Sequence, residues 1–308
     1  MSSTQDGLGR DSTRLGAGII GCGRVGAVIG AALRGAGHAV IGVSATSEAS
    51  RERADAMLPG VPVLEIPEIV ERAELLMVTV SDDAIGPLVS GLAKGGHFQE
   101  GQIVAHWAGR FGTEVLRPAA EAGAITIAFH PSLSFTGTSI DLPRLREATV
   151  GVTAAKPVLP IGQALVVEMG AEPVILAEAD RALYHAAICH ASNHVVTVLS
   201  QAMRTLESLG VDQPSRVLDA LVTASVRNTL ESGAKALTGP VSRGDVSTVE
   251  AHLEALAEQA AQDGSTEILD AYRQMSRATA QAALQTGRIT PETAERLLEV
   301  LADPGSRR

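Results

Sequence analysis

Short apolar segments alternate with longer amphipathic ones over the first half of the chain. The apolar runs that predict strands lie at residues 15–20, 39–43, 62–64, 75–80, 103–106, 124–129, 149–152 and 173–176. Between several of them, apolar positions recur at helical spacing, at residues 24–34, 67–72, 85–93, 114–121 and 159–169. Apolar strands joined by crossover helices are typical of a parallel sheet that helices cover on both faces. The pattern therefore predicts an α/β domain with a parallel sheet.

Beyond about residue 177 the strand pattern stops and only helical segments follow. They lie at residues 178–209, 215–231, 246–262, 267–284 and 291–301, with a Gly- and Pro-containing break at 236–245, ALTGPVSRGD. The first fourteen residues, MSSTQDGLGRDSTR, are polar, lack the apolar segment of a signal peptide and are typical of a disordered tail. The sequence therefore predicts a tail at 1–14, an α/β domain at 15–176 and an all-helical domain at 177–303.

Composition and charge narrow the class of protein. The 308 residues include 45% hydrophobic and 19% charged residues, which is typical of a soluble globular chain, and the formal net charge is −10. Without a run of Lys or Arg, this charge argues against nucleic acid and anionic membranes as partners. No stretch reaches the length of a membrane span. Cys22 and Cys189 lack C-x-x-C spacing, so neither a disulfide framework nor a zinc knuckle is expected. We expect a cytoplasmic enzyme or binding protein.

A glycine pattern follows the first predicted strand directly. Gly21, Gly23 and Gly26 form G-x-G-x-x-G between that strand and the next predicted helix. In this context the first glycine allows a tight turn, the second lets a pyrophosphate approach the backbone, and the third lets helix and strand pack closely. A plain glycine-rich turn is the alternative, but the position favours a Rossmann-type dinucleotide site. The cofactor contacts predicted in this turn are Gly21, Cys22, Gly23, Arg24, Val25 and Gly26.

The end of the second predicted strand indicates which dinucleotide binds. An NAD site places Asp or Glu there to hold the ribose hydroxyls, whereas this chain has Ser44 and Thr46, followed by Arg51 and Arg53. Because hydroxyls with nearby arginines suit a 2′-phosphate, we expect NADP. NAD is the alternative, since Glu48 could hold a ribose while the arginines are solvated helix residues.

Hydride transfer also needs a proton donor near the substrate, and three segments offer candidates. VAHWAGR places His106 and Arg110 at a strand end, where ligands of open α/β sheets collect, and IAFHPSLSFTG does the same for His130, Ser132 and Ser134. Val80 and Ser81, at the end of the 75–80 strand, are expected beside the nicotinamide half of the cofactor. The third segment, DRALYHAAICHASNHVV, lies on the first helix of the all-helical domain.

On that helix, polar side chains form a stripe. At about 100° per residue, Arg181, His185 and Ser192 fall on one face, with Asn193 towards its flank. The rest of the helix is apolar almost all round, so we expect it to be buried. A buried polar stripe is costly unless it meets partners, so these groups either bind a ligand or bond to loop carbonyls. A histidine pair at i, i+4 spacing lacks a third ligand, and no metal site is expected.

Several segments together resemble a known group of proteins. They are the glycine turn, HWAG, HPSLSF, LYHAAICHASNH and ALTGPVSRGDVSTVEAHL. From about residue 15 to 300 the chain resembles a Rossmann-like family with an all-helical C-terminal domain of unassigned function. This family is similar to the 6-phosphogluconate dehydrogenase-like superfamily, whose members include ketopantoate, pyrroline-carboxylate and deazaflavin-dependent NADP reductases. The resemblance implies a homodimer formed through the helical domain, an active site between the domains, and ketopantoate as the first candidate for a small anionic substrate.

The chain also departs from this group at one position. Many dehydrogenases of the superfamily carry a Lys four residues before an Asn on the first helix after the sheet, whereas here Arg181 stands in that region and Asn193 lies much further along. Because arginine does not readily release its proton, we expect Arg181, with Ser192 and Asn193, to anchor the substrate carboxylate. The proton donor would then be His185 or His130.

Two further functions stay open at the level of sequence. A non-catalytic sensor of NADP(H) that acts through its helical dimer would explain the missing Lys, whereas the polar stripe favours catalysis. An imine or deazaflavin reductase would keep the fold and the cofactor and change only the substrate. The main prediction is an NADPH-dependent reductase of a small 2-oxo acid.

Overall fold

The computed structural model describes residues 14–302, which divide into two compact units. Unit 1 reaches to Ser192 and unit 2 begins at Asn193, so the boundary lies inside the long helix α8 (Arg181–Ser208). Except for its last residue, the predicted tail at 1–14 lies outside the described residues. Within residues 14–302, no helix is both long and apolar enough to cross a membrane.

Unit 1 is built on a seven-stranded sheet with the order β2-β1-β3-β4-β5-β6-β7. Its strands are β1 (Gly16–Ile20), β2 (Ala39–Ser44), β3 (Leu75–Val78), β4 (Ile103–His106), β5 (Ile125–Pro131), β6 (Thr149–Ala154) and β7 (Glu172–Ile175). The first five run parallel to one another. Every residue of β3 and β4 is buried, as expected for strands covered on both faces. The predicted fold class is confirmed.

The last two strands differ in direction from the parallel sheet that the sequence predicts. β6 pairs antiparallel with β5, with Gly151 opposite His130, and β7 runs parallel to β6. The segment between β5 and β6 carries only the short helix α6 (Asp141–Arg146) and does not return the chain to the opposite edge of the sheet, as a parallel crossover would. Apolar alternation predicts that a strand exists but does not encode its direction.

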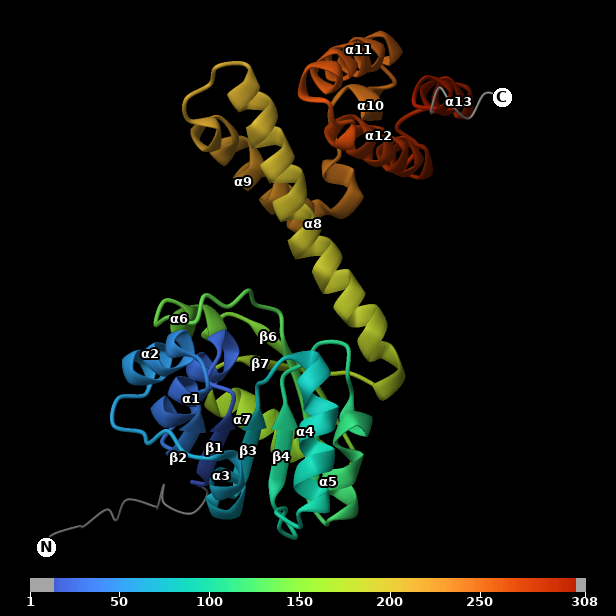
Figure 1. The fold of residues 1–308 in the computed structure, drawn as a ribbon. Coiled ribbons are helices and arrows are strands. Elements are labelled where there is room, and N and C mark those ends of the chain that lie inside the picture. Colours follow the sequence, from blue (N-terminus) through green and yellow to red (C-terminus); the bar gives the residue numbers. More distant parts are fainter. Residues whose placement is uncertain (1–13, 303–308) are drawn as a thin grey trace, which may run out of the picture. The chain divides into compact units, whose positions relative to one another are not determined.

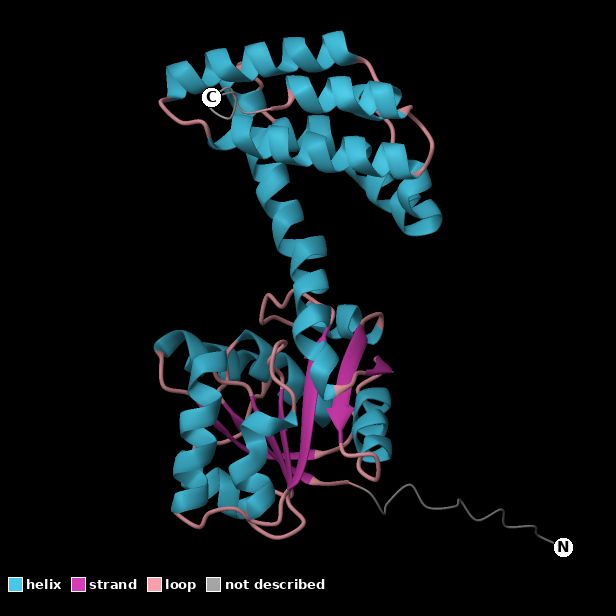
Figure 2. Cartoon of the chain, turned by 90° about the vertical axis from the view of Figure 1, so that its right-hand side faces the viewer, coloured by secondary structure: helices cyan, strands magenta, loops and turns pink. Residues whose placement is uncertain are grey.

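Helices cover both faces of this sheet (Figures 1 and 2). One face packs against α1 (Arg24–Gly35), α2 (Glu48–Met57) and α7 (Leu159–Glu168), and the other against α3 (Ile66–Arg72), α4 (Asp82–Lys94), the short 3-10 segment η1 (Thr113–Leu116) and α5 (Arg117–Glu121). The predicted strand at 62–64 makes only one bridge, between Val43 and Val63. The apolar pattern did not reveal α2, because its sequence, EASRERADAM, carries no continuous apolar stripe and buries only Ser50 and Ala54.

The helices predicted after residue 177 are present with small shifts of their ends. A 3-10 turn, η2 (Glu178–Asp180), precedes α8, and α9 (Pro214–Ser232), η3 (Gly233–Ala236), α10 (Pro240–Arg243), α11 (Val246–Asp263), α12 (Glu267–Gln285) and α13 (Pro291–Val300) follow. The predicted break at 236–245 contains α10, which ends at Gly244 in the left-handed conformation. Buried side chains of α10 to α13, among them Val249 and Leu297, form the core of unit 2.

The expectation that α8 is buried is wrong for the described chain. Leu183 is 75% exposed and Val196 65% exposed, and on α9 Leu230 is 83% exposed. Arg181 and Gln201 are the buried residues of α8. The apolar character of α8 is therefore not explained by packing among residues 14–302.

Candidate cofactor and active site

The glycine turn between β1 and α1 gives each of its three glycines a different environment. Gly21 has a φ of +97°, and a Cβ there would lie 3.0 Å from the Val80 nitrogen. A Cβ on Gly26 would overlap the Gly21 carbonyl oxygen and lie 2.5 Å from the Thr79 hydroxyl. A Cβ on Gly23 would meet nothing within 4 Å. The first glycine is thus required by the turn, the third by helix–strand packing, and the second faces open space.

The N-terminus of α1 has the features of an anion site. Gly23 is the N-cap, no side chain caps the helix, and no acidic residue lies in the first turn. The first hydrogen bond of the helix runs from the Ala27 N–H to the Gly23 oxygen at 3.1 Å. The N–H groups of Arg24, Val25 and Gly26 therefore have no acceptor within the helix. Free amides together with the positive end of a helix dipole favour phosphate. These residues fit the pyrophosphate of a dinucleotide.

Two of the predicted cofactor contacts, Cys22 and Ser44, instead hold the turn in place by hydrogen bonds. The Cys22 N–H donates to the Ser44 oxygen at 2.8 Å, and the Gly21 N–H donates to the Ser44 hydroxyl at 2.9 Å. Both Cys22 and Ser44 are buried, and burial raises the pKa of the Cys22 thiol to about 11. We therefore assign Cys22 and Ser44 to holding the turn, whereas Thr46 is exposed.

The carboxyl ends of β1 and β3 meet at this turn. β1 pairs with β2 on one side and β3 on the other, so the chain crosses to opposite sides of β1 in successive connections, and such a switch point is where open α/β sheets bind ligands. Val80 lies against Gly21, and Ser81 is the N-cap of α4. Both residues predicted near the nicotinamide half thus border the switch point.

Of the arginines predicted near the second strand, Arg53 approaches the turn. A Cβ on Gly137 would lie 3.0 Å from the Arg24 Cα and 3.1 Å from the Arg53 Cδ, so both arginines border the same glycine. The Arg53 charge also opposes the rise in the pKa of Cys22. Arg51 is exposed and, two positions from Arg53, points to the opposite side of α2.

A cluster of polar side chains lies at the carboxyl end of β5, facing the first turns of α8. The His130 ring meets the rings of Tyr184 and His185 edge to face, with centroids 5.8 and 5.1 Å away. The Tyr184 hydroxyl hydrogen-bonds the Ser132 hydroxyl at 2.8 Å, and His185 Nε2 lies 3.4 Å from Cys189 Sγ. Five groups able to donate or accept a proton therefore gather within unit 1.

In this cluster, His130 is the residue whose ring nitrogens are left available for a ligand. Within residues 14–302, neither of its buried ring nitrogens makes a hydrogen bond of normal geometry, and a weaker interaction with the Trp107 backbone only opposes the fall in the pKa of the ring. Burial, aided by the charges of His185 and Arg181, lowers the pKa of His130 to about 4, so the ring is neutral near pH 7. A buried imidazole without partners costs free energy, which a ligand that pairs with it would offset.

His106 has a different role from the one its sequence position indicated. Its Nε2 donates to the Gly112 oxygen at 2.8 Å, and its Nδ1 accepts from the Ala108 N–H at 3.1 Å. Burial lowers the pKa of His106 to about 4, so it stays neutral and holds the segment after β4 in place. Gly109 in that segment lies directly against the His185 ring, where a Cβ would overlap it.

The predicted role of Arg181 as a substrate anchor does not fit its environment. Its side chain is completely buried. Nη1 donates to the Ala128 oxygen and the Thr153 hydroxyl at 3.2 and 3.1 Å, and Nη2 donates to the oxygens of Ala108 and Phe129 at 2.8 and 3.1 Å. Burial lowers the pKa of Arg181 to about 10, which leaves it charged near pH 7. Because all four Nη hydrogens are donated within the protein, only the Nε–H is left, which cannot form a two-bond fork with a carboxylate. Arg181 therefore ties β5 and β6 to the segment after β4.

The remaining predicted site residues lie further along α8. Ser192 is exposed, and its hydroxyl donates to the Ile188 oxygen at 2.8 Å. Asn193 is the first residue of unit 2. Their roles at a substrate stay predictions.

Sequence reasoning missed Tyr184 and underrated Ser132. Tyr184 lies one turn from Arg181, within 60° of the predicted stripe, and is one of two tyrosines in the chain. If the polar stripe on this helix had been defined more broadly, it would have included Tyr184. The bond between Tyr184 and Ser132 joins segments 52 positions apart and follows no local pattern.

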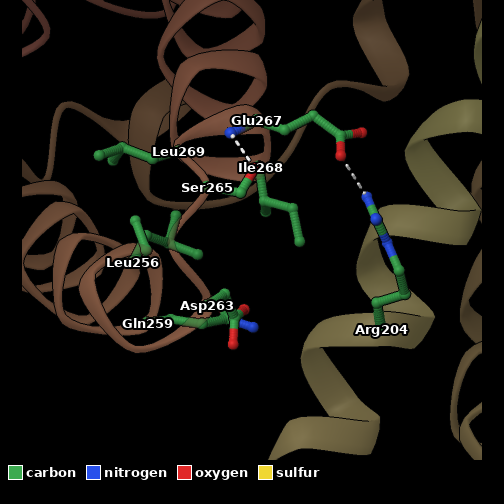
Figure 3. A pocket seen from close by; sticks show the side chains of 9 residues that line it. Arg204, Leu256, Gln259, Asp263, Ser265, Glu267, Ile268 and Leu269 are labelled. Carbon is green, nitrogen blue, oxygen red and sulfur yellow. Dashed lines mark hydrogen bonds and ion pairs between the residues drawn. The ribbon is translucent and has the colours of Figure 1, made fainter.

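A pocket also lies in unit 2. Its volume is about 260 Å³, and it is lined by Arg204, Leu256, Gln259, Ala260, Asp263, Ser265, Glu267, Ile268 and Leu269 (Figure 3). Arg204 and Glu267 pair with each other at 2.8 Å, and Gln201 also donates to Glu267, so both bonds lower the pKa of this carboxyl. The opposite charges of Arg204 and Glu267 therefore compensate each other.

Family models match the two parts of the chain separately. Residues 1–131 match a Rossmann-like domain, and residues 148–279 match a domain of unknown function, DUF2520. These matches confirm the resemblance to a Rossmann-like family with a helical domain of unassigned function. Comparison with curated protein sequences gives no match.

Several solved structures share the fold at low sequence identity. A candidate NADP oxidoreductase from Bacteroides fragilis, BF3122, is 20% identical with a TM-score of 0.72, over 87% of this chain and 98% of its own. An imine reductase from Pseudomonas sp. is 15% identical with a TM-score of 0.65, over 94% and 100%. Pyrroline carboxylate reductase from Plasmodium falciparum with NADP bound is 11% identical with a TM-score of 0.54, over 86% and 98%. At these identities the comparison establishes the fold.

Proposed function

We propose that this chain, which joins a Rossmann-like domain to a DUF2520 domain, is an NADPH-dependent oxidoreductase acting on a small compound. One arrangement carries the proposal: an uncapped helix N-terminus with open space at Gly23 lies in the same unit as a neutral, unpaired His130 at the carboxyl edge of the sheet. The first feature fits a dinucleotide, and the second fits a substrate that needs a hydrogen-bonding partner.

The positive charges at the turn favour NADP over NAD. Arg24 and Arg53 border the same glycine beside the N-terminus of α1, and no carboxylate ends β2. Guanidinium groups stabilise a 2′-phosphate, whereas NAD sites use a carboxylate on the ribose. When bound, the nicotinamide would supply the hydride.

The side chains of the cluster provide the proton that a reduced oxygen or nitrogen requires. His130 is neutral and therefore suited to orient the substrate by a hydrogen bond. His185, whose ring lies against His130 and the Gly109 backbone, is positioned to donate the proton. The hydroxyls of Tyr184 and Ser132 complete the polar side of the site.

A carbonyl or imine without a carboxylate fits this cluster better than ketopantoate does. The proposal of a small 2-oxo acid depended on Arg181, whose four Nη bonds are made within the protein. Among the hydrogen bonds and ion pairs of the described residues, none joins an arginine or lysine to His130, Tyr184 or His185. A cyclic imine therefore becomes the first substrate class, and ketopantoate remains a comparison in the assay.

The exposed apolar side chains support the proposed homodimer. Leu183 and Val196 on α8, with Leu221 and Leu230 on α9, are each at least 64% exposed in the chain. Exposed apolar side chains along two helices are typical of chains that bury them in an interface, which a second copy of the chain would supply.

Turnover with defined substrates tests the proposed function. Purified full-length protein is mixed with NADPH and a panel of cyclic imines, neutral ketones and ketopantoate, and loss of NADPH absorbance is followed. We expect turnover of an imine or neutral ketone, and a drop in kcat of roughly 10²-fold or more in His185→Gln with unchanged NADPH affinity. His190→Gln, an exposed histidine on the same helix, is the matched control. Tight NADPH binding with no turnover of any compound would favour the sensor and overturn the enzyme.

A further inference from the structure

Glu178 is a carboxylate to which no sequence motif assigns a role, yet it accepts several hydrogen bonds from one short stretch of backbone. It lies in η2, directly before α8, and its Oε2 accepts from the Thr113 N–H at 2.8 Å and the Thr113 hydroxyl at 3.2 Å. Its Oε1 accepts from the Glu114 N–H at 3.3 Å. Because N–H groups at the start of a helix lack acceptors within it, Glu178 completes the start of η1 from the beginning of α8.

The residue before η1 is a glycine that makes room for this carboxylate. Gly112 has a φ of −93°, a negative value that residues with side chains also adopt. A Cβ at this position would overlap the Glu178 carboxylate. The close approach of Glu178, and not a left-handed backbone, therefore explains the glycine.

Residues 107–112 connect β4 to η1, and we name them the β4–η1 segment. Near its first end, Arg181 Nη2 donates to the Ala108 oxygen at 2.8 Å. His106 links the two ends, because its Nδ1 accepts from the Ala108 N–H and its Nε2 donates to the Gly112 oxygen. The backbone of this segment is therefore held at both ends.

The start of α8 supplies the charged residues that hold this segment. Glu178 belongs to the turn before α8, and Arg181 is the first residue of the helix. Between the ends that they hold, Gly109 lies directly against the His185 ring. One short stretch of chain thus carries the proposed proton donor and both charges that fix the backbone on which its ring rests.

We infer that Glu178 is a positioning residue for His185 and acts through the β4–η1 segment. The inference rests on the proposed function and adds a residue that controls the geometry of proton transfer. Without the carboxylate, the Gly112 end of the segment is released, and Gly109 no longer keeps the ring in one place. Because a displacement of about 1 Å can lower a rate by up to about 10²-fold, kcat falls while binding at the glycine turn is unchanged.

Turnover of the best substrate of the panel by the full-length chain with NADPH tests the carboxylate. We expect Glu178→Ala to lower kcat by roughly tenfold or more and to keep NADPH affinity within about twofold. Glu178→Gln retains one acceptor oxygen and should restore most of kcat. Asp180→Asn removes a carboxylate charge from the same 3-10 turn and should keep kcat within about twofold. Equal losses in Glu178→Ala and Asp180→Asn would indicate a general charge effect and overturn the inference.

Gly112→Ala tests the same contact from the other side. Its Cβ would displace the Glu178 carboxylate, so kcat should fall as it does in Glu178→Ala. The double variant should lose no more than either single variant, because both changes break one contact. Losses that add up would show that the two residues act independently and would overturn the inference.

The NMR signal of the His185 ring gives a readout that does not depend on turnover. With isotope-labelled histidine, the signal is assigned by its loss in His185→Gln. It should move in Glu178→Ala and Gly112→Ala and stay in place in Asp180→Asn. If wild type turns over no compound, the proposed function fails, and this signal still decides the inference. If wild type is active and neither kcat nor the ring signal changes in Glu178→Ala, only the present inference fails.

Discussion

Replacing Arg181 tests whether its guanidinium holds the fold or the substrate. The side chain is buried and donates to three backbone oxygens and the Thr153 hydroxyl. Arg181→Ala removes these four bonds, deletes the charge and leaves a cavity between β5, β6 and the segment after β4. If the guanidinium is structural, stability falls before any effect on substrate binding can be measured.

The expected loss follows from the number of bonds. At about 1 kcal/mol of net stability for each of the four bonds, Arg181→Ala should lower the free energy of unfolding of unit 1 by about 4 kcal/mol. At a denaturant dependence of roughly 2–3 kcal/mol per molar urea, the midpoint shifts by roughly 1.3–2 M. Arg181→Lys keeps the charge but not the planar fork, so we expect about half of this loss.

The single tryptophan makes this measurement specific to unit 1. Trp107 is buried and stacks on Phe129, whose carbonyl oxygen accepts from Arg181, so its emission reports unfolding around the substituted site. Arg117→Ala, an exposed arginine of the same unit, is the control and should change stability by less than about 1 kcal/mol. The reasoning is refuted if Arg181→Ala unfolds like wild type and instead raises KM for an anionic substrate alone.

Three further predictions concern the glycine turn, the buried histidines and the thiols. Gly23→Ala should keep the melting temperature but weaken NADPH binding by at least tenfold in calorimetry, because its Cβ has space in the protein and would occupy the path of the phosphate. Burial lowers the pKa of His106 and His130 from 6.5 to about 4, so the unfolded chain binds more protons between these values. Urea unfolding should therefore show stability falling as the pH drops from about 6.5 to 4, and a flat profile would contradict the assignment. A thiol reagent at neutral pH should label Cys189 and not Cys22, whose pKa is about 11, and mass spectrometry of the labelled peptides checks this.

Local sequence patterns predicted the part of the fold that depends on local physics. The turn at Gly21 requires a positive φ and close packing, and both requirements act between neighbouring elements, so the G-x-G-x-x-G spacing was sufficient to locate it. Apolar periodicity likewise located most strands and most helices. It missed α2, whose polar surface carries no apolar stripe, and it carried no information on the reversed direction of β6.

The candidate site was less predictable because its groups are paired over long distances in the sequence. The helical spacing of Arg181 and His185 indicated a polar face, and this face does meet the sheet. Whether the guanidinium met a ligand or a carbonyl depended on strand ends 52 to 73 positions away, which no local pattern describes. The same limit applies to Gly137, whose approach to Arg24 depends on the path of the chain after β5.

The buried charge of Arg181 connects the stability of unit 1 with the chemistry of its polar cluster. The guanidinium has carbonyl partners and remains protonated near pH 7, so its positive charge stays close to His106 and His130. That charge, added to burial, lowers the pKa of both histidines and keeps them neutral. A neutral His106 can hold the segment after β4 by accepting at one nitrogen and donating at the other, which a protonated ring could not do. The interaction that joins α8 to the sheet therefore adds to the effect of burial, which is the main reason that both histidines stay neutral.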